Sequence, residues 1–251
     1  MERLCDLDFA ISPGAFFQTN TSATEKLYKR IAEYAETNNL STILDVCCGT
    51  GSIGLSLAKL LGRKDLYLVG IELSSAAIED AKQNADLNDI STRKVHFIAA
   101  KAEDAISDGI KEGAEADSRA KVEHEYDDDG YFADKQYVAV LDPPRAGVQK
   151  SVLQALRSCR GLNRVVYVSC NPTGSFVRDC SILCAAFGGP KGKYKGMPFR
   201  LKSATPVDLF PQTAHTEIVA LFERHKDDIP GTNNEENAAS PLQPDSLTTD
   251  T

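Results

Sequence analysis

The first candidate for a catalytic side chain in this sequence is a thiol that directly follows an apolar run. Residues 165–168 predict a buried strand, and Ser169, Cys170, Asn171 and Pro172 come next. A cysteine at the carboxyl end of a parallel strand faces the crevice where open α/β sheets bind ligands. Free cysteines are more often small core residues, so the neighbouring motifs decide the interpretation. We interpret Cys170 as a nucleophile.

A second polar motif follows the strand predicted at residues 137–141, where the chain continues as Asp142-Pro143-Pro144-Arg145. Consecutive prolines exclude regular strand pairing and give a stiff loop. A stiff loop that carries an acid and a guanidinium is suited to holding a planar polar group. We expect this loop to lie beside Cys170, because the carboxyl ends of parallel strands share one edge of a sheet.

A glycine-rich turn after the strand at residues 43–46 predicts a nucleotide-type site, with the sequence Cys47-Cys48-Gly49-Thr50-Gly51-Ser52. Glycines allow close backbone approach, and a helix start offers free N–H groups. Glu72 ends the next strand (66–72) about 20 residues later, the spacing at which an acid meets a ribose. This pattern is shared by dinucleotide and S-adenosylmethionine sites. It lacks the lysine of a triphosphate loop. Alternatively, Glu72 is only an acid in the first turn of a helix.

Two further residues are weaker candidates for ligand contact. Gln18 follows Phe16 and Phe17, and a packed strand edge is as good an interpretation there as a ligand contact. Asp104 follows the strand at residues 95–99, and in a doubly wound sheet this acid falls near an adenine ring. Its alternative is a helix N-cap.

The elements that position these residues predict an α/β fold. Strands alternate with helical patterns up to residue 184, and two strands (199–206 and 216–223) close the order. This matches the methyltransferase variant of the doubly wound fold. We expect residues 1–40 to be a lead-in segment with the first helix, and 41–225 to be the main domain. An exposed acidic insertion is expected at about 107–135, and a disordered tail at 226–251.

The amino-acid composition indicates which kinds of partner and which cellular compartment are expected. The net charge of −8 argues against a protein that holds nucleic acid by bulk electrostatics. Seven cysteines without metal-type spacing suggest a reducing compartment and no metal site. No apolar run is long enough to span a bilayer, and the amino terminus lacks a signal-peptide pattern. We therefore expect an intracellular protein, cytoplasmic or nuclear, without membrane contact.

Taken together, the motifs resemble those of the uracil-5 RNA methyltransferases from about Phe9 to Arg224. Five signatures occur in order: Phe16-Phe17-Gln18-Thr19-Asn20, Asp45-Val46-Cys47-Cys48-Gly49-Thr50-Gly51, Asp142-Pro143-Pro144-Arg145-Ala146-Gly147, Ser169-Cys170-Asn171-Pro172, and Asp208-Leu209-Phe210-Pro211-Gln212-Thr213 with His215 and Glu217. The resemblance implies a Rossmann-like class I S-adenosylmethionine-dependent methyltransferase. It would have a mostly parallel seven-stranded sheet with helices on both faces.

By this resemblance, the cofactor S-adenosyl-L-methionine contacts Gln18, Cys47, Ser52, Glu72 and Asp142. The family often has an aromatic residue and an Asn or Thr where Cys47 and Ser52 stand, so those two contacts are expected through the backbone. Cys170 corresponds to the nucleophile and Glu217 to the general base. The partner that the resemblance implies is RNA, with the T-loop of a tRNA as the expected target. The family usually places an RNA-binding domain ahead of this one, and this sequence contains no such segment.

The resemblance implies methylation of carbon 5 of uridine through a Cys170 adduct at carbon 6. Two alternatives remain open. A related enzyme could act on cytosine or on a small molecule, although cytosine-5 enzymes commonly carry a second cysteine in a Pro-Cys context, which Asp142-Pro143-Pro144-Arg145 lacks. The second alternative is a catalytically dormant module that binds or folds RNA.

Overall fold

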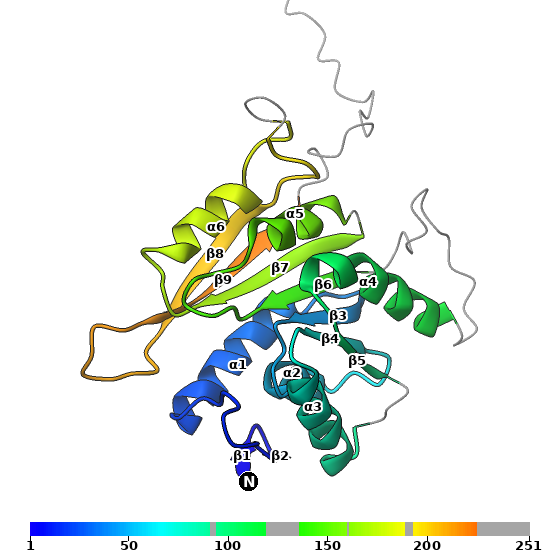
Figure 1. Ribbon diagram of the computed structural model, residues 1–251, viewed down its shortest axis with the longest axis vertical. Helices are drawn as coiled ribbons and strands as arrows, with labels where there is room; N and C mark the ends of the chain where they lie inside the picture. Colours follow the sequence, from blue (N-terminus) through cyan, green and yellow to red (C-terminus); the bar gives the residue numbers. More distant parts are fainter. Residues whose placement is uncertain (91–93, 119–135, 160, 189–192, 225–251) are drawn as a thin grey trace, which may run out of the picture.

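The computed structural model describes residues 1–90, 94–118, 136–159, 161–188 and 193–224 (Figure 1). Their centre is a seven-stranded sheet in the order β5-β4-β3-β6-β7-β9-β8. The strands are β3 (Leu40–Val46), β4 (Tyr67–Glu72), β5 (Val95–Ala99), β6 (Gln136–Leu141), β7 (Leu162–Ser169), β8 (Arg200–Val207) and β9 (Glu217–Glu223). The pairs from β5 to β7 are parallel, whereas β9 runs antiparallel to both β7 and β8. This order confirms the predicted fold class.

Helices cover both faces of the sheet (Figure 1). On one face lie α1 (Thr21–Ala35), α2 (Ser52–Leu61) and α3 (Ser75–Leu87); on the other lie α4 (Ala102–Ser118), α5 (Lys150–Ser158) and α6 (Ser175–Leu183). Successive strand residues point to opposite faces, so Ile43 packs in the first of two core clusters and Leu44 in the second. Each central strand is therefore buried along most of its length, as in parallel sheets that are covered on both faces.

Polar side chains cap the starts of α1 and α3. The side chain of Asn20 accepts a hydrogen bond from the Ala23 N–H at α1, and Ser74 accepts one from Ala77 at α3. The lead-in segment also forms a small hairpin that the sequence did not predict, made of β1 (Glu2–Leu4) and β2 (Leu7–Phe9). Asn88 holds it to α3, accepting from the Asp8 N–H and donating to the Asp8 carbonyl.

The acidic insertion predicted at about 107–135 was placed too early in the chain. Helix α4 continues to Ser118, and Ile106, Ile110 and Ala114 are buried against the sheet. A Cβ at Gly113 would lie 2.5 Å from Oγ1 of Thr42, so glycine is what lets this helix approach β3. Glycines and acids hid the apolar period of the helix in the sequence. The rest of the predicted insertion and the predicted tail lie outside the described residues. Among the described helices, none is long and apolar enough to cross a bilayer.

Candidate active site

The predicted site residues come together in a cavity of about 480 Å³. The carboxyl ends of the parallel strands and the segment before α1 form its walls, as expected for an open α/β sheet. Seven of the eight predicted residues line it: Gln18, Cys47, Ser52, Glu72, Asp142, Cys170 and Glu217. Phe16, Phe17, Pro144, Arg145 and Phe210 line it too, so all five sequence signatures meet there.

Cys170 and Glu217 reach the cavity from neighbouring antiparallel strands. The β7–β9 ladder ends with Ser169 paired to Ile218. Cys170 and Glu217 lie directly beyond this last pair, and the Glu217 carboxylate is close enough to the sulfur to raise its pKa. A nucleophile and a carboxylate thus face the same small volume.

The electrostatics of the cavity suit a carboxylate that takes up a proton. Burial and the nearby Asp142 raise the pKa of Glu217 to about 7, although Arg145 acts in the opposite direction. Burial also raises the pKa of Asp142 to about 6. A carboxyl with a pKa near 7 is an effective general base at neutral pH.

The Cys170 thiol is half-buried rather than packed in the core. Burial and Glu217 raise its pKa, whereas Arg145, which is within hydrogen-bonding reach of the sulfur, lowers it. Arg145 is therefore the cation that stabilises a Cys170 thiolate. The backbone behind the sulfur is fixed, because the Asn171 N–H donates to Oγ of Ser169 and the Asn171 amide donates to the Arg145 carbonyl.

The glycine-rich turn is held from both sides by carboxylates. The Gly54 N–H donates to Asp45 at 2.8 Å, and the Gly49 N–H donates to Glu72 at 3.3 Å. Glu72 also accepts from the Ser74 N–H through its other oxygen. The alternative of a first-turn acid is wrong, because Ser74 caps α3 and its first turn contains no acid, whereas Glu72 stands in the cavity wall.

Cys47 adopts a φ of 65°, which is uncommon for a residue other than glycine. Such backbone conformations cluster at functional sites. Burial and the carboxylates of Glu72, Asp45 and Asp142 raise the pKa of the Cys47 thiol to about 12, so this sulfur stays protonated at neutral pH. The surroundings of Cys47 therefore favour a neutral thiol in the cavity wall.

A second hollow of about 310 Å³ shares Cys47, Glu72 and Pro144 with the cavity. Its other walls include Ala100, Ala102, Glu103 and Val148. Asp104, the eighth predicted residue, is exposed in the first turn of α4 and lines neither hollow. The adjacent Glu103 does line the second hollow, where it accepts a hydrogen bond from Ser151. Of these two adjacent acids, Glu103 and not Asp104 therefore faces the second hollow.

Sequence reasoning also missed Tyr28. This buried residue of α1 lines the cavity, and its hydroxyl lies 3.0 Å from Oγ of Ser52. Its position in the apolar stripe of α1 made it resemble a core residue, and no sequence signal distinguished it. Phe210, quoted only as part of a motif, lines the cavity and packs edge-on against the His215 ring.

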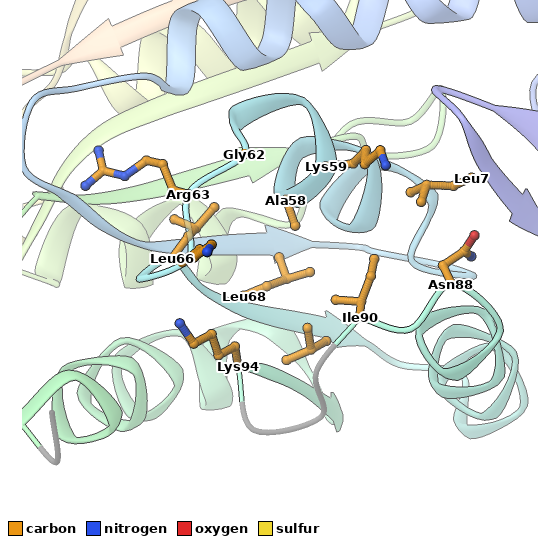
Figure 2. Close-up of a pocket in the computed structure, with 12 residues that line it drawn as sticks. Leu7, Ala58, Lys59, Gly62, Arg63, Leu66, Leu68, Asn88, Ile90 and Lys94 are labelled. Atoms are coloured by element: carbon orange, nitrogen blue, oxygen red, sulfur yellow. The ribbon is translucent and has the colours of Figure 1, made fainter.

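A separate hollow of about 500 Å³ lies away from these residues, where α2 and α3 end and β4 and β5 begin (Figure 2). Leu66, Leu68 and Ile90 form an apolar floor, and Lys59, Arg63, Lys64 and Lys94 surround it. None of the residues predicted to be functional lines it. Among the described residues, no cluster of three or more His, Cys, Asp or Glu side chains could hold a metal ion.

The tRNA (uracil-5-)-methyltransferase family model matches residues 5–185. The chain belongs to this family. It is 44% identical to tRNA (uracil-5-)-methyltransferase homolog A of Mus musculus over 89% of its own length and 32% of the mouse protein. Identity to homolog B of Danio rerio is 39%, over 89% of the chain and 41% of that protein. The chain therefore spans less than half the length of these relatives.

Solved structures resemble the chain in fold alone. A human methyltransferase 10 domain containing protein aligns with a TM-score of 0.51 at 14% identity, over 86% of this chain and 89% of that one. A precorrin-6y C5,15-methyltransferase from Geobacter metallireducens gives 0.50 at 10% identity, over 86% and 94%. Together with the strand order, these likenesses establish the class I methyltransferase fold.

Proposed function

We propose that this chain is the catalytic domain of an enzyme that methylates carbon 5 of a uridine in tRNA, at the T-loop, with S-adenosyl-L-methionine as methyl donor. The observation that carries the proposal is the cavity that Cys170 and Glu217 share with the glycine-rich turn. A nucleophile, a raised-pKa base and a nucleotide-type turn are the three parts that this reaction requires.

The residues present fit the cofactor. Glu72 stands at the junction of the two hollows, where its carboxylate would accept from a ribose hydroxyl. The smaller hollow has apolar walls and, besides the shared Glu72, one further acid, Glu103, which suits an adenine ring. Gln18, Ser52 and Asp142 line the larger cavity, where the methionine portion would extend towards Cys170. When bound, S-adenosylmethionine supplies a methyl group on a positively charged sulfur.

The chain's own residues then carry the covalent chemistry. Carbon 5 of uracil is a poor nucleophile, but addition of the Cys170 thiolate at carbon 6 makes the ring an enolate whose carbon 5 takes up the methyl group. The Glu217 carboxylate removes the proton from carbon 5. The electron pair re-forms the carbon 5–carbon 6 double bond, and the Cys170 thiolate leaves. Asp142 and Arg145 are placed to hold the ring during these steps.

The target base must leave its stack to reach Cys170, which costs a few kcal/mol in a duplex and less in a loop. Phe16, whose side chain is 74% exposed while lining the cavity, provides an aromatic surface at the entrance. A T-loop uridine therefore suits this cavity better than a uridine in a stem.

The proposal is tested by incubating the chain with an unmodified tRNA transcript and S-adenosylmethionine, followed by nucleoside mass spectrometry. The expected product is 5-methyluridine at one T-loop position. 5-Methylcytidine, or methylation of a free nucleoside only, would identify a different substrate. Stable tRNA binding without methyl incorporation would identify a dormant RNA-binding module.

A further inference from the structure

The acidic charge of the chain is concentrated in two segments. Residues 119–135 contain six acids and three bases, and residues 225–251 contain six acids and one base, which together account for the net charge of −8. The rest of the chain carries equal numbers of acidic and basic side chains, so the folded part can present local positive surfaces. The overall charge therefore does not decide how the fold meets a polyanion.

One such surface gathers around a tyrosine between α6 and β8. The Nζ of Lys193 lies 5.4 Å from the centre of the Tyr194 ring, and the Nζ of Lys150, the first residue of α5, lies 5.9 Å from it. Lys195 follows in sequence. We call Lys150, Lys193, Tyr194 and Lys195 the Tyr194 patch. Its three lysines are exposed and its ring is half-exposed. Within the described residues, none of these lysines forms an ion pair.

The patch is held in place by backbone contacts. Tyr194 and Gly188 exchange N–H to carbonyl bonds of 2.9 and 3.3 Å. The Gln154 amide donates to the Lys193 carbonyl, and the buried guanidinium of Arg157 donates to the Lys195 carbonyl. A surface fixed in this way loses little conformational entropy when it binds a partner.

Helix stability does not explain the position of Lys150. A cation in the first turn of a helix opposes the helix dipole, which favours acids there. Lys150 nevertheless lies over the Tyr194 ring, so the charged groups of Lys150, Lys193 and Arg157 lie 5.4–5.9 Å from the centre of one ring. Cations interleaved with an aromatic ring are the elements with which proteins hold single-stranded nucleic acid.

The patch is also close in sequence to the reaction cavity. Lys150 follows Pro144, a residue of the cavity wall, by six positions, a span of at most about 20 Å. That span equals roughly six stacked nucleotides at about 3.4 Å per step. An RNA with one base in the cavity can therefore reach the patch.

The positive cluster around the separate hollow is a weaker candidate (Figure 2). Arg63 there is paired with Asp65 and Glu36. The floor between its cations is aliphatic, and none of the described residues that line the hollow is aromatic. Its lysines, Lys59, Lys64 and Lys94, are exposed, so they form a control set with the same charge as the patch.

We propose that the Tyr194 patch is a docking surface for substrate RNA outside the reaction cavity. Its lysines contact phosphates and the Tyr194 ring stacks on a base. This inference rests on the proposed function for the identity of the partner. In this inference the patch contributes to the affinity for RNA and takes no part in the chemical step.

The experiment compares a Lys150→Ala/Lys193→Ala/Lys195→Ala variant with a Lys59→Ala/Lys64→Ala/Lys94→Ala variant. The Kd for a tRNA transcript is measured by filter binding over a range of salt concentrations. The patch variant is expected to bind roughly tenfold or more weakly, and its slope of log K against log salt should fall by about 3. The control variant should match the unmodified chain. S-adenosylmethionine affinity and melting temperature should be the same in all three.

Tyr194→Leu and Tyr194→Phe separate stacking from loop structure. The phenylalanine variant should keep the RNA affinity of the unmodified chain, whereas the leucine variant should lose several-fold in Kd. Unchanged RNA binding in the lysine patch variant overturns the inference. So does an equal loss in both lysine variants, or the absence of RNA binding by the unmodified chain.

The two proposals fail separately. If the unmodified chain binds tRNA through the patch but forms no 5-methyluridine, the docking surface stands and the proposed reaction is wrong. If 5-methyluridine forms equally well in the patch variant at limiting RNA, the reaction stands and the docking surface is wrong.

Discussion

Cys170 and Glu217 occupy the step directly after the Ser169–Ile218 pair of the antiparallel β7–β9 ladder. Two strands that lie 48 residues apart in sequence thereby bring a thiol and a carboxyl into one cavity. The relationship explains why the closing strand β9 runs antiparallel: its first residue arrives at the edge of the sheet where the parallel strands end. The first two predictions follow from this pairing.

Glu217→Gln should stop the reaction after the covalent step. The amide has nearly the shape of the carboxyl but cannot take up the carbon 5 proton, so the methylated adduct should persist. Denaturing gels with labelled tRNA should show a protein–RNA band that is much stronger than in the unmodified chain. A variant that releases 5-methyluridine at the unmodified rate would assign the base to another residue.

The pH dependence should show the raised pKa of Glu217, about 7. The base acts in its deprotonated form, so product release should rise about tenfold per pH unit below 7 and more gently above it. Because the Cys170 pKa is raised as well, the rate should continue to rise on the alkaline side. Rates of product release measured from pH 5.5 to 9 check this, and the rate of adduct formation by Glu217→Gln should lack the break near 7. A rate that falls with pH through this range would contradict the assignment.

Substitutions of the three acids Glu72, Glu103 and Asp104 should have different effects on the affinity for the cofactor. Glu72→Gln and Glu103→Gln should each weaken S-adenosylmethionine binding, by roughly tenfold for the ribose contact, since a lost charged hydrogen bond costs about 1.5–3 kcal/mol. Asp104→Asn should leave the affinity unchanged, because this side chain is exposed outside both hollows. Titration calorimetry measures all three. An Asp104 effect as large as that of Glu72 would restore the sequence-based choice.

Stability should distinguish two glycines with the same backbone conformation. Gly62 and Gly196 have φ of +61° and +69°, but a Cβ at Gly62 meets nothing within 4 Å, whereas one at Gly196 would lie 2.3 Å from the Arg157 carbonyl carbon. Gly62→Ala should cost about 1 kcal/mol through backbone strain. Gly196→Ala should cost at least about 2 kcal/mol more, because it displaces the helix that holds the buried Arg157. Urea unfolding gives both values, and equal costs would refute the packing argument.

The sequence predicted the fold class and the meeting of the strand-end motifs because both follow from local patterns. Apolar runs ending in Glu72, Asp142 and Cys170 are read directly from the chain. Three features were not predictable in this way. Helix α4 depends on Gly113 meeting Thr42, the choice of Glu103 depends on the rotation of α4, and Tyr28 depends on the packing of α1 over Ser52. Each is a tertiary contact between segments far apart in sequence.

The most direct measurement uses a T-arm RNA carrying 5-fluorouridine at the target position. Fluorine at carbon 5 cannot be removed as a proton, so a Cys170 adduct that has accepted the methyl group cannot resolve. Intact-protein mass spectrometry should show the chain plus one RNA plus one methyl group, with the link on the peptide that contains Cys170, and no adduct for Cys170→Ala. If the chain forms 5-methyluridine on ordinary RNA yet gives no such adduct, or if Cys170→Ala remains active, covalent catalysis by Cys170 is contradicted.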